Sequence, residues 1–186
     1  LESLESIKPD WERASGVPEL LKKHLSPDVT KVIVFCQDLA HLEEMEVEVP
    51  GWFHKAGVFA RRNLYRVVSE DNKEAQEDIR AFRDAKSGRR LHILFAINMF
   101  NEGLHVPGVD VVILLRPTES PTVFFQQIGR CMDVGNANPP TIIDLVNNFQ
   151  SIRCQDFLSA VKISSETQAV ITSLKRVLFT FTSASR

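Results

Sequence analysis

The chain has 186 residues, of which 44% are hydrophobic and 25% are charged, and its formal net charge is −2. This length and composition are typical of one globular domain that buries a substantial core. The slight acidity gives no electrostatic reason to expect a dedicated nucleic-acid binder, although it is compatible with a local basic patch. No apolar run approaches the roughly 20 residues that a bilayer-spanning helix needs. We therefore expect a cytoplasmic location without membrane contact.

The cysteines and histidines predict neither a disulfide framework nor a metal site. Cys36, Cys131 and Cys154 are odd in number and widely spaced, so we expect free thiols in a reducing compartment. The five histidines show no metal-binding spacing such as H-E-x-x-H. The chain begins at Leu1 rather than Met, which leads us to expect a fragment of a longer polypeptide.

In chain order, a short helix over Pro18–Leu25 precedes a series of apolar runs rich in β-branched residues. These runs are Val32–Phe35, Leu64–Val68, Leu91–Phe95, Val111–Leu115 and Thr141–Val146. Short, nearly continuous apolar runs are typical of parallel strands that are covered on both faces.

Helical patterns lie between and after these runs. The predicted helices are Asp38 (cap) to Met45, Lys73–Ala85 capped by Asp71 or Asn72, Ser120–Met132 with Pro121 in its first turn, and Asp156–Leu178. The segment Glu46–Arg62 fits either a helix or an irregular insertion. This alternation predicts an α/β fold: a mostly parallel sheet with right-handed crossovers and helices on both faces, followed by an α-helical C-terminal extension.

In an open parallel sheet, ligands bind beyond the carboxyl ends of the strands. Ala96–Asp110 and the Ser120–Met132 helix are both predicted to lie there. Within the first segment, Gly103 permits a turn or a close ligand approach that a Cβ would block.

Gln126, Arg130 and Asp133 are spaced by four and three residues, so they share one helix face. An arginine can bind phosphate oxygens through two hydrogen bonds, and a glutamine can hydrogen-bond a ribose or a phosphate. Spacing alone favours a plainer interpretation, a surface helix whose Arg130–Asp133 ion pair contributes a few tenths of a kcal/mol. The chain has no G-x-x-x-x-G-K-[ST] phosphate loop and no G-x-S-x-G nucleophile motif. It therefore cannot be expected to cradle a triphosphate alone.

Two pairs of basic residues, Arg61–Arg62 and Arg89–Arg90, stand just before predicted strands. Such pairs are usually solvated surface charges, although they can contact backbone phosphates.

Three segments together resemble a known family. They are VIVFCQD (Val32–Asp38), ILFAINMFNEGLHVPGVD (Ile93–Asp110) and FFQQIGRCMDVG (Phe124–Gly135). In this order and separation they resemble motifs IV, V and VI of the C-terminal RecA-like lobe of superfamily-two helicases, closest to DEAD/DEAH-type and restriction-subunit-like members. The resemblance covers roughly residues 28–150 and implies a RecA-like lobe there. The sequence patterns predict a helical lead-in over residues 1–27 and a helical extension over 151–186, and the extension has no family signature.

In that family two lobes enclose ATP, and the first lobe carries the phosphate loop and the Mg²⁺-binding motif. The resemblance implies that this chain is the second motor lobe. ATP and Mg²⁺ are then the expected cofactors of the full-length protein, with neither bound tightly to this fragment. The expected partners are the N-terminal lobe of the same polypeptide and DNA or RNA, with DNA slightly favoured.

The resemblance also implies site residues. The expected nucleotide-binding residues are Glu102, Gly103, His105, Gln126, Arg130 and Asp133, of which Gln126 and Arg130 are the expected catalytic residues. The expected nucleic-acid contacts are Cys36, Gln37, Ile97 and Asn98.

Three positions depart from the family pattern. Ile97 replaces a Thr that contacts nucleic acid, and His105 replaces an Asp that contacts the ribose. Asp133 replaces the second arginine of motif VI, the usual arginine finger. These departures leave open a degenerate lobe that binds nucleic acid or a partner without hydrolysis, whereas the retained Gln126, Gly129 and Arg130 favour a motor. A small-molecule enzyme on a Rossmann-like sheet would need a glycine fingerprint after the first strand, and none is present.

Overall fold

The computed structural model describes residues 16–26, 28–69, 73–86, 88, 90–97, 106–118, 128–129, 131, 140–146 and 148. Its elements are α2 (Val17–His24), β1 (Lys31–Phe35), α3 (Leu39–Lys55), β2 (Arg61–Val67), α4 (Lys73–Asp84), β3 (Arg90–Ala96), β4 (Val111–Leu114) and β5 (Thr141–Asp144).

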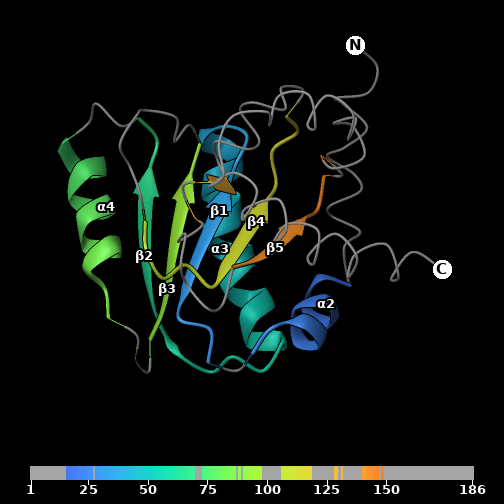
Figure 1. The fold of residues 1–186 in the computed structure, drawn as a ribbon. Coiled ribbons are helices and arrows are strands. Elements are labelled where there is room, and N and C mark those ends of the chain that lie inside the picture. The colour runs from blue at the N-terminus through green and yellow to red at the C-terminus, as the bar shows by residue number, and fades with distance from the viewer. Residues whose placement is uncertain are drawn as a thin grey trace, which may run out of the picture.

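The strands form one five-stranded sheet in the order β2-β3-β1-β4-β5, and every neighbouring pair is parallel (Figure 1). All of the predicted strands are confirmed, with small changes at their ends. The predicted α/β fold is therefore correct.

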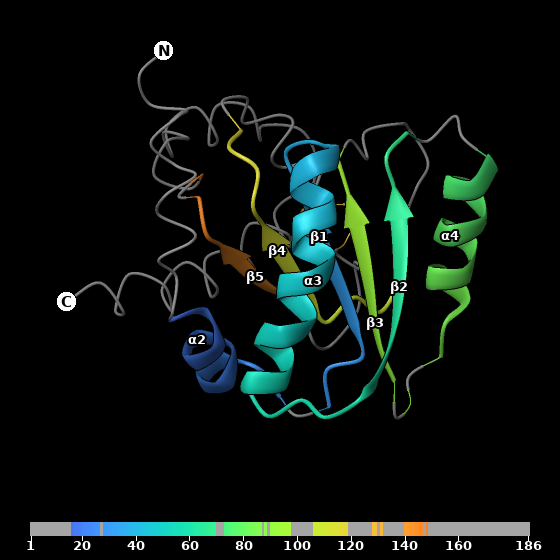
Figure 2. The same ribbon diagram turned by 180° about the vertical axis from the view of Figure 1, so that it is seen from behind.

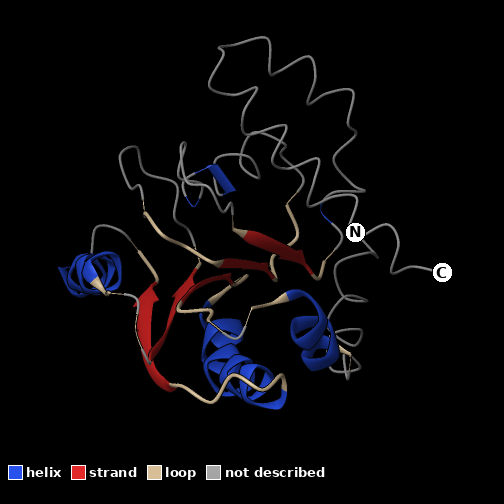
Figure 3. Cartoon of the chain, turned by 60° about the horizontal axis from the view of Figure 1, so that its bottom comes forward, coloured by secondary structure: helices blue, strands red, loops and turns tan. Residues whose placement is uncertain are grey.

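Helices cover both faces of the sheet. Helices α2 and α3 lie on one face, and α4 packs on the other face beside the β2 edge (Figures 2 and 3). The side chains of β1 alternate between two cores: Val34 packs with Leu42 and Phe53 of α3, whereas Ile33 packs with Phe82 of α4. Because β1 is buried on both faces, every one of its positions must tolerate apolar surroundings.

Helix α3 resolves the ambiguous segment after Met45. Asp38 caps its start, where the carboxylate Oδ1 accepts the His41 N–H at 2.9 Å. The helix then continues to Lys55 through Pro50. A proline inside a helix costs about 3 kcal/mol, and the burial of the neighbouring core residues Trp52 and Phe53 offsets this cost.

Pro50 therefore does not end the helix, and the residue that ends it lies later in the sequence. Gly57 follows the last turn of α3 with a φ of 95°, a conformation that favours glycine and terminates helices. The segment from residue 46 to residue 62 is accordingly helix, turn and the start of β2.

The remaining helices follow the predictions where the structure describes them. Helix α2 contributes Val17 and Leu21 to the core that it shares with α3, and α4 has the predicted start and nearly the predicted end. Of the predicted Ser120–Met132 helix, only residues 128, 129 and 131 are described, and they are helical. The cap candidates Asp71 and Asn72 and the C-terminal extension lie outside the described residues.

A single carboxylate joins the amino ends of three strands. Asp110 Oδ2 accepts hydrogen bonds from the Thr30 N–H (2.7 Å), the Thr30 hydroxyl (3.0 Å) and the Lys31 N–H (2.9 Å). The Asp110 backbone also donates to the Lys31 carbonyl and accepts from the Thr141 N–H. One residue before β4 thus fixes the starts of β1 and β5.

Replacing Asp110 by Ala should lower the free energy of unfolding by about 2–3 kcal/mol, because two backbone N–H groups lose a charged acceptor. Urea denaturation would measure this loss. Asp110→Asn keeps an acceptor oxygen and should lose less. Asp84→Ala removes an exposed carboxylate that pairs with the exposed Arg83 at 3.6 Å, and it should change stability by less than about 0.5 kcal/mol. An equal effect of Asp84→Ala and Asp110→Ala would contradict the role of this clamp.

Candidate nucleotide and nucleic-acid site at the carboxyl edge of the sheet

The carboxyl ends of β3, β1 and β4 lie side by side. Phe35, the last residue of β1, pairs with Ala96 on one side and with Leu114 on the other. Beyond these pairs, the Cys36 N–H donates to the Ala96 carbonyl at 2.8 Å and the Leu115 N–H donates to the Phe35 carbonyl at 3.0 Å. The segments that follow the three strands therefore leave the sheet at one place, as the sequence predicts.

The segment after β1 is a rigid turn that exposes Gln37. The Gln37 N–H donates to His41 Nδ1 at 3.2 Å, and the His41 N–H donates in turn to Asp38 at 2.9 Å. His41 itself is buried. Its ring thus fixes the backbone of the turn and leaves the Gln37 side chain facing solvent.

Cys36 points the other way, into the core beneath α3. Its side chain is fully buried. Burial, and then the carboxylates of Glu46 and Asp38, raise the pKa of the Cys36 thiol from 9.0 to about 12. The thiol is therefore neutral near pH 7 and is no nucleophile. Of the two residues expected to contact nucleic acid here, only Gln37 presents its side chain at the surface.

Ile97, the residue after β3, is also buried and packs into the α3-side core. Its carbonyl accepts a hydrogen bond from Arg116 Nη1 at 3.0 Å. Arg116 follows β4, so this bond crosses the end of β1, which lies between β3 and β4 in the sheet. Sequence reasoning did not single out Arg116, although an arginine directly after a strand at the ligand-binding edge is a signal that could have found it.

A buried amide fixes the turn that begins at Arg116. Asn148 is 2% exposed; its Oδ1 accepts the Thr118 N–H at 2.7 Å and its Nδ2 donates to the Arg116 carbonyl at 3.0 Å. Asn148 lies beyond β5, far from this turn in sequence. We call Arg116, Thr118 and Asn148 the edge clamp. No sequence pattern reveals it, because its partners meet only in the folded sheet.

The helix that carries motif VI is anchored by apolar residues. Ile128 and Cys131 are buried in the α4-side core, and Gly129 is exposed. Gln126, Arg130 and Asp133 lie outside the described residues, as do Asn98, Glu102, Gly103 and His105. Their assignment to nucleotide or nucleic acid stays a prediction.

Within the described part of the chain, no group of three or more His, Cys, Asp or Glu side chains is placed to hold a metal ion. Cys36 and Cys131 are both buried, and neither forms a disulfide among the described residues. None of the described helices is long and apolar enough to span a bilayer.

The family model of the helicase conserved C-terminal domain matches residues 16–135, which is more than half of the chain. The chain belongs to this family. The matched residues include α2.

Known relatives of this helicase C-terminal domain are much longer proteins. The chain is 31% identical over 113 residues to the 51.5 kDa protein of Lactococcus phage (isolate 7-9), covering 60% of this chain and 23% of the phage protein. It is 23% identical over 142 residues to Probable helicase A859L of African swine fever virus (isolate Tick/South Africa/Pretoriuskop Pr4/1996), covering 74% of this chain and 15% of the viral protein. Among solved structures, the ATP-dependent Type ISP restriction-modification enzyme LlaBIII bound to DNA matches with a TM-score of 0.48 and 16% identity, over 62% of this chain and 8% of the enzyme.

Asn148→Ala should destabilise the helicase C-terminal domain by about 3 kcal/mol, because it leaves the Thr118 N–H and the Arg116 carbonyl buried without their partner. Urea denaturation would measure the loss. Asn63→Ala is a matched control, since the Asn63 amide contacts the exposed Arg90 side chain, and it should cost less than about 1 kcal/mol. If the two variants were equally stable, the edge clamp would have no structural importance.

The raised pKa of the Cys36 thiol predicts that the domain loses stability at high pH. Its pKa is raised in the folded state, so the unfolded chain ionises first as pH rises. The contribution of Cys36 is complete below about pH 9 and is lost between about pH 9 and 12, with a slope approaching about 1.4 kcal/mol per pH unit. Urea denaturation from pH 8 to pH 10.5 should therefore show a steeper decline for the native sequence than for Cys36→Ala. Parallel curves would contradict the shifted pKa.

Proposed function

We propose that this chain is the second motor lobe of an ATP-dependent helicase or translocase. In this proposal it completes an ATP cleft with an N-terminal lobe of the same polypeptide. The observation that carries the proposal is the family match over residues 16–135, which includes all three motif segments in one continuous stretch.

The geometry of the carboxyl edge supports this proposal. Arg116 and Asn148 join the ends of β3, β4 and the segment after β5 through the edge clamp. The loop of motif V begins at this edge, and the chain toward the motif VI helix leaves from it. Fixed positions of this kind favour catalysis, because phosphoryl transfer depends on placing groups around the phosphates rather than on covalent chemistry of the protein.

In this proposal Gln126 and Arg130 face the nucleotide. The phosphate loop and the Mg²⁺ ligands belong to the absent lobe, and bound Mg²⁺ would neutralise charge that develops on the phosphates. Arg130 is the motif VI arginine that this chain offers to the same charge. Asp133 can hold the Arg130 guanidinium through an ion pair, but it cannot stabilise negative charge itself.

Nucleic acid is the proposed substrate, along which the motor moves. The family match supports it. Gln37 is the best-placed described contact, because its side chain is exposed on a rigid turn. DNA is slightly favoured over RNA.

A second candidate function is a degenerate lobe that binds without hydrolysis. One described feature favours it: the Ile97 side chain is 7% exposed and belongs to the core, where a motif V threonine would reach nucleic acid. His105 and Asp133 are the other two departures.

Arg130→Ala in the full-length protein should reduce nucleic-acid-stimulated ATP turnover by about 10³-fold, because no second motif VI arginine replaces it. Asp133→Ala should reduce turnover far less, since it frees Arg130 but removes its support. The measurement is kcat at saturating nucleic acid, with Lys22→Ala on the exposed face of α2 as the control. Near-native turnover of Arg130→Ala would favour the degenerate lobe, and ATP hydrolysis by the purified 186-residue chain alone would contradict the two-lobe proposal.

A further inference from the structure

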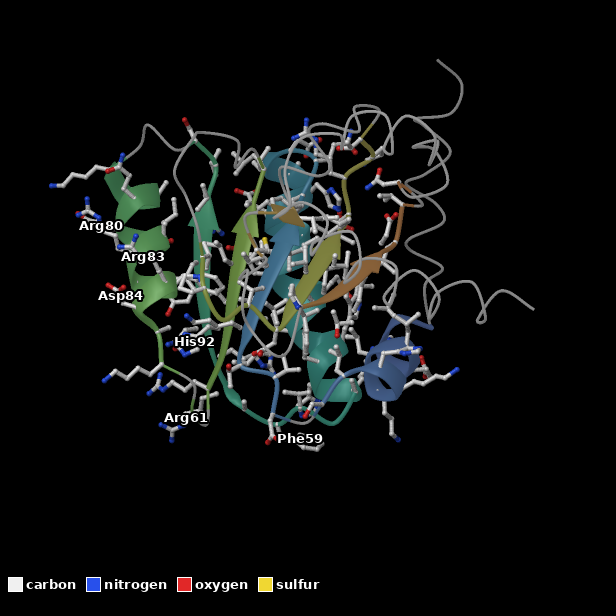
Figure 4. The ribbon with its side chains drawn as sticks, in the orientation of Figure 1. Phe59, Arg61, Arg80, Arg83, Asp84 and His92 are labelled. Atoms are coloured by element: carbon white, nitrogen blue, oxygen red, sulfur yellow. The ribbon has the colours of Figure 1, made fainter. Side chains whose placement is uncertain are left out.

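One arginine from each basic pair of the sequence meets the other in the sheet. Arg61 and Arg90 are the first residues of β2 and β3, and the parallel register places them directly opposite each other. Both are exposed. Figure 4 shows Arg61 at the amino end of β2, the end of the sheet opposite to the carboxyl edge. Like charges that face each other across a sheet destabilise it, so this arrangement needs a reason.

A neutral amide, rather than a carboxylate, contacts Arg90. Arg90 Nη1 donates to the Asn63 amide oxygen at 3.1 Å. Among the described residues, neither Arg61 nor Arg90 forms an ion pair with a carboxylate. Their positive charges therefore remain available to an external anion.

The neighbouring groups carry charges of both signs: burial lowers the pKa of Lys31, and the carboxylates of Asp110 and Asp84 act against this lowering. Lys31, on the adjacent strand, donates its Nζ to the Arg83 carbonyl at 2.9 Å, so its hydrogen bond goes to a neutral partner. His92 lies two residues after Arg90, and its pKa is lowered by burial and then by the charges of Lys31 and Arg90. The nearby Asp110 carboxylate is occupied by the backbone of β1.

An exposed aromatic ring lies at the same end of the sheet. Phe59, two residues before Arg61, is 77% exposed. Its ring contacts the edge-on His54 ring, at 5.0 Å between centroids, and it lies at the same end of the sheet as Arg61 (Figure 4). Exposed aromatic rings among cations are typical of surfaces that bind single-stranded nucleic acids, because bases stack on the rings while the cations contact phosphates.

We propose that this amino edge, made of Phe59, Arg61 and Arg90, is a second contact for single-stranded nucleic acid. Arg61 and Arg90 bind backbone phosphates, and Phe59 stacks on a base. Charge complementarity gives the two facing arginines a role, and the exposed ring favours a nucleic acid over an acidic protein. The contact is separate from the carboxyl edge and requires no ATP, so it does not depend on the proposed motor function.

The test is fluorescence anisotropy with labelled dT20 and the 186-residue chain, at several NaCl concentrations and without ATP. Arg61→Gln/Arg90→Gln should weaken binding at least about 10-fold at low salt. It should also reduce the slope of log affinity against log salt by about 1.4, since each phosphate contact on a single strand contributes about 0.7. Phe59→Leu should weaken binding at least about 5-fold without changing that slope.

Lys22→Gln/Lys23→Gln is the matched control, because it removes the same charge from exposed positions on α2. It should change dT20 affinity less than about 2-fold, in line with the screening of distant surface charges. Equal losses in the two double variants would overturn the proposal, because binding would then follow net charge alone. Tighter binding of poly-L-glutamate than of dT20, lost in Arg61→Gln/Arg90→Gln, would also overturn it in favour of an acidic protein partner.

Thermal unfolding separates binding from folding. Removing the facing charges should leave Tm unchanged or raise it by about 1–3 °C. If the double variant does not fold, Arg61→Gln alone keeps the Arg90–Asn63 hydrogen bond and should reduce the salt slope by about 0.7. Unchanged dT20 affinity in Arg61→Gln, together with a lower Tm, would identify these arginines as structural and overturn the proposal.

Discussion

Parallel pairing on both sides of β1 is the constraint on which the rest of this domain depends. A strand that pairs in parallel with two neighbours sends all three chains to the same edge, and each crossover must then return over a face of the sheet. The crossovers through α3 and α4 lie on opposite faces, so β1 is buried on both sides. From this one arrangement follow the apolar strands, the two cores and the gathering of loops at the carboxyl edge.

Polar residues fix the ends of the strands, which apolar packing alone does not hold in register. The hydrophobic effect is non-directional, so it does not by itself hold the ends of strands in register. Asp110 provides direction at the amino ends, where one carboxylate oxygen receives three hydrogen bonds. Asn148 provides it at the carboxyl ends through the edge clamp. The two groups lie at opposite ends of the sheet, and each joins segments that are distant in sequence.

The net charge of −2 conceals an uneven distribution of charge. At the carboxyl edge, burial and then the negative charges of Glu46 and Asp38 raise the pKa of the Cys36 thiol. At the amino end of β2 and β3, arginines face each other instead. Electrostatic attraction acts over about a Debye length, roughly 8 Å at physiological salt, so a partner senses the local charge rather than the sum. A slightly acidic chain can therefore still present a basic surface.

The sequence by itself determined the class of this protein. The five apolar runs predict the strands, the alternation with helical patterns predicts a parallel sheet, and three motifs in order indicate the helicase C-terminal domain. These features are local or follow from chain order, which is why they can be read without coordinates. The extent of α3 was not predictable, because Pro50 is a local helix-ending signal that only the burial of Trp52 and Phe53 overrides.

Only the tertiary structure decided which distant residues meet. It placed the Ile97 and Cys36 side chains in the core rather than at the surface, because the first residue after a parallel strand can still continue the alternation of the buried strand. It brought Asn148 to Arg116, and it set Arg61 opposite Arg90. Each of these contacts depends on strand order and register. The free energy that selects this order and register comes from contacts between residues that are far apart in the sequence.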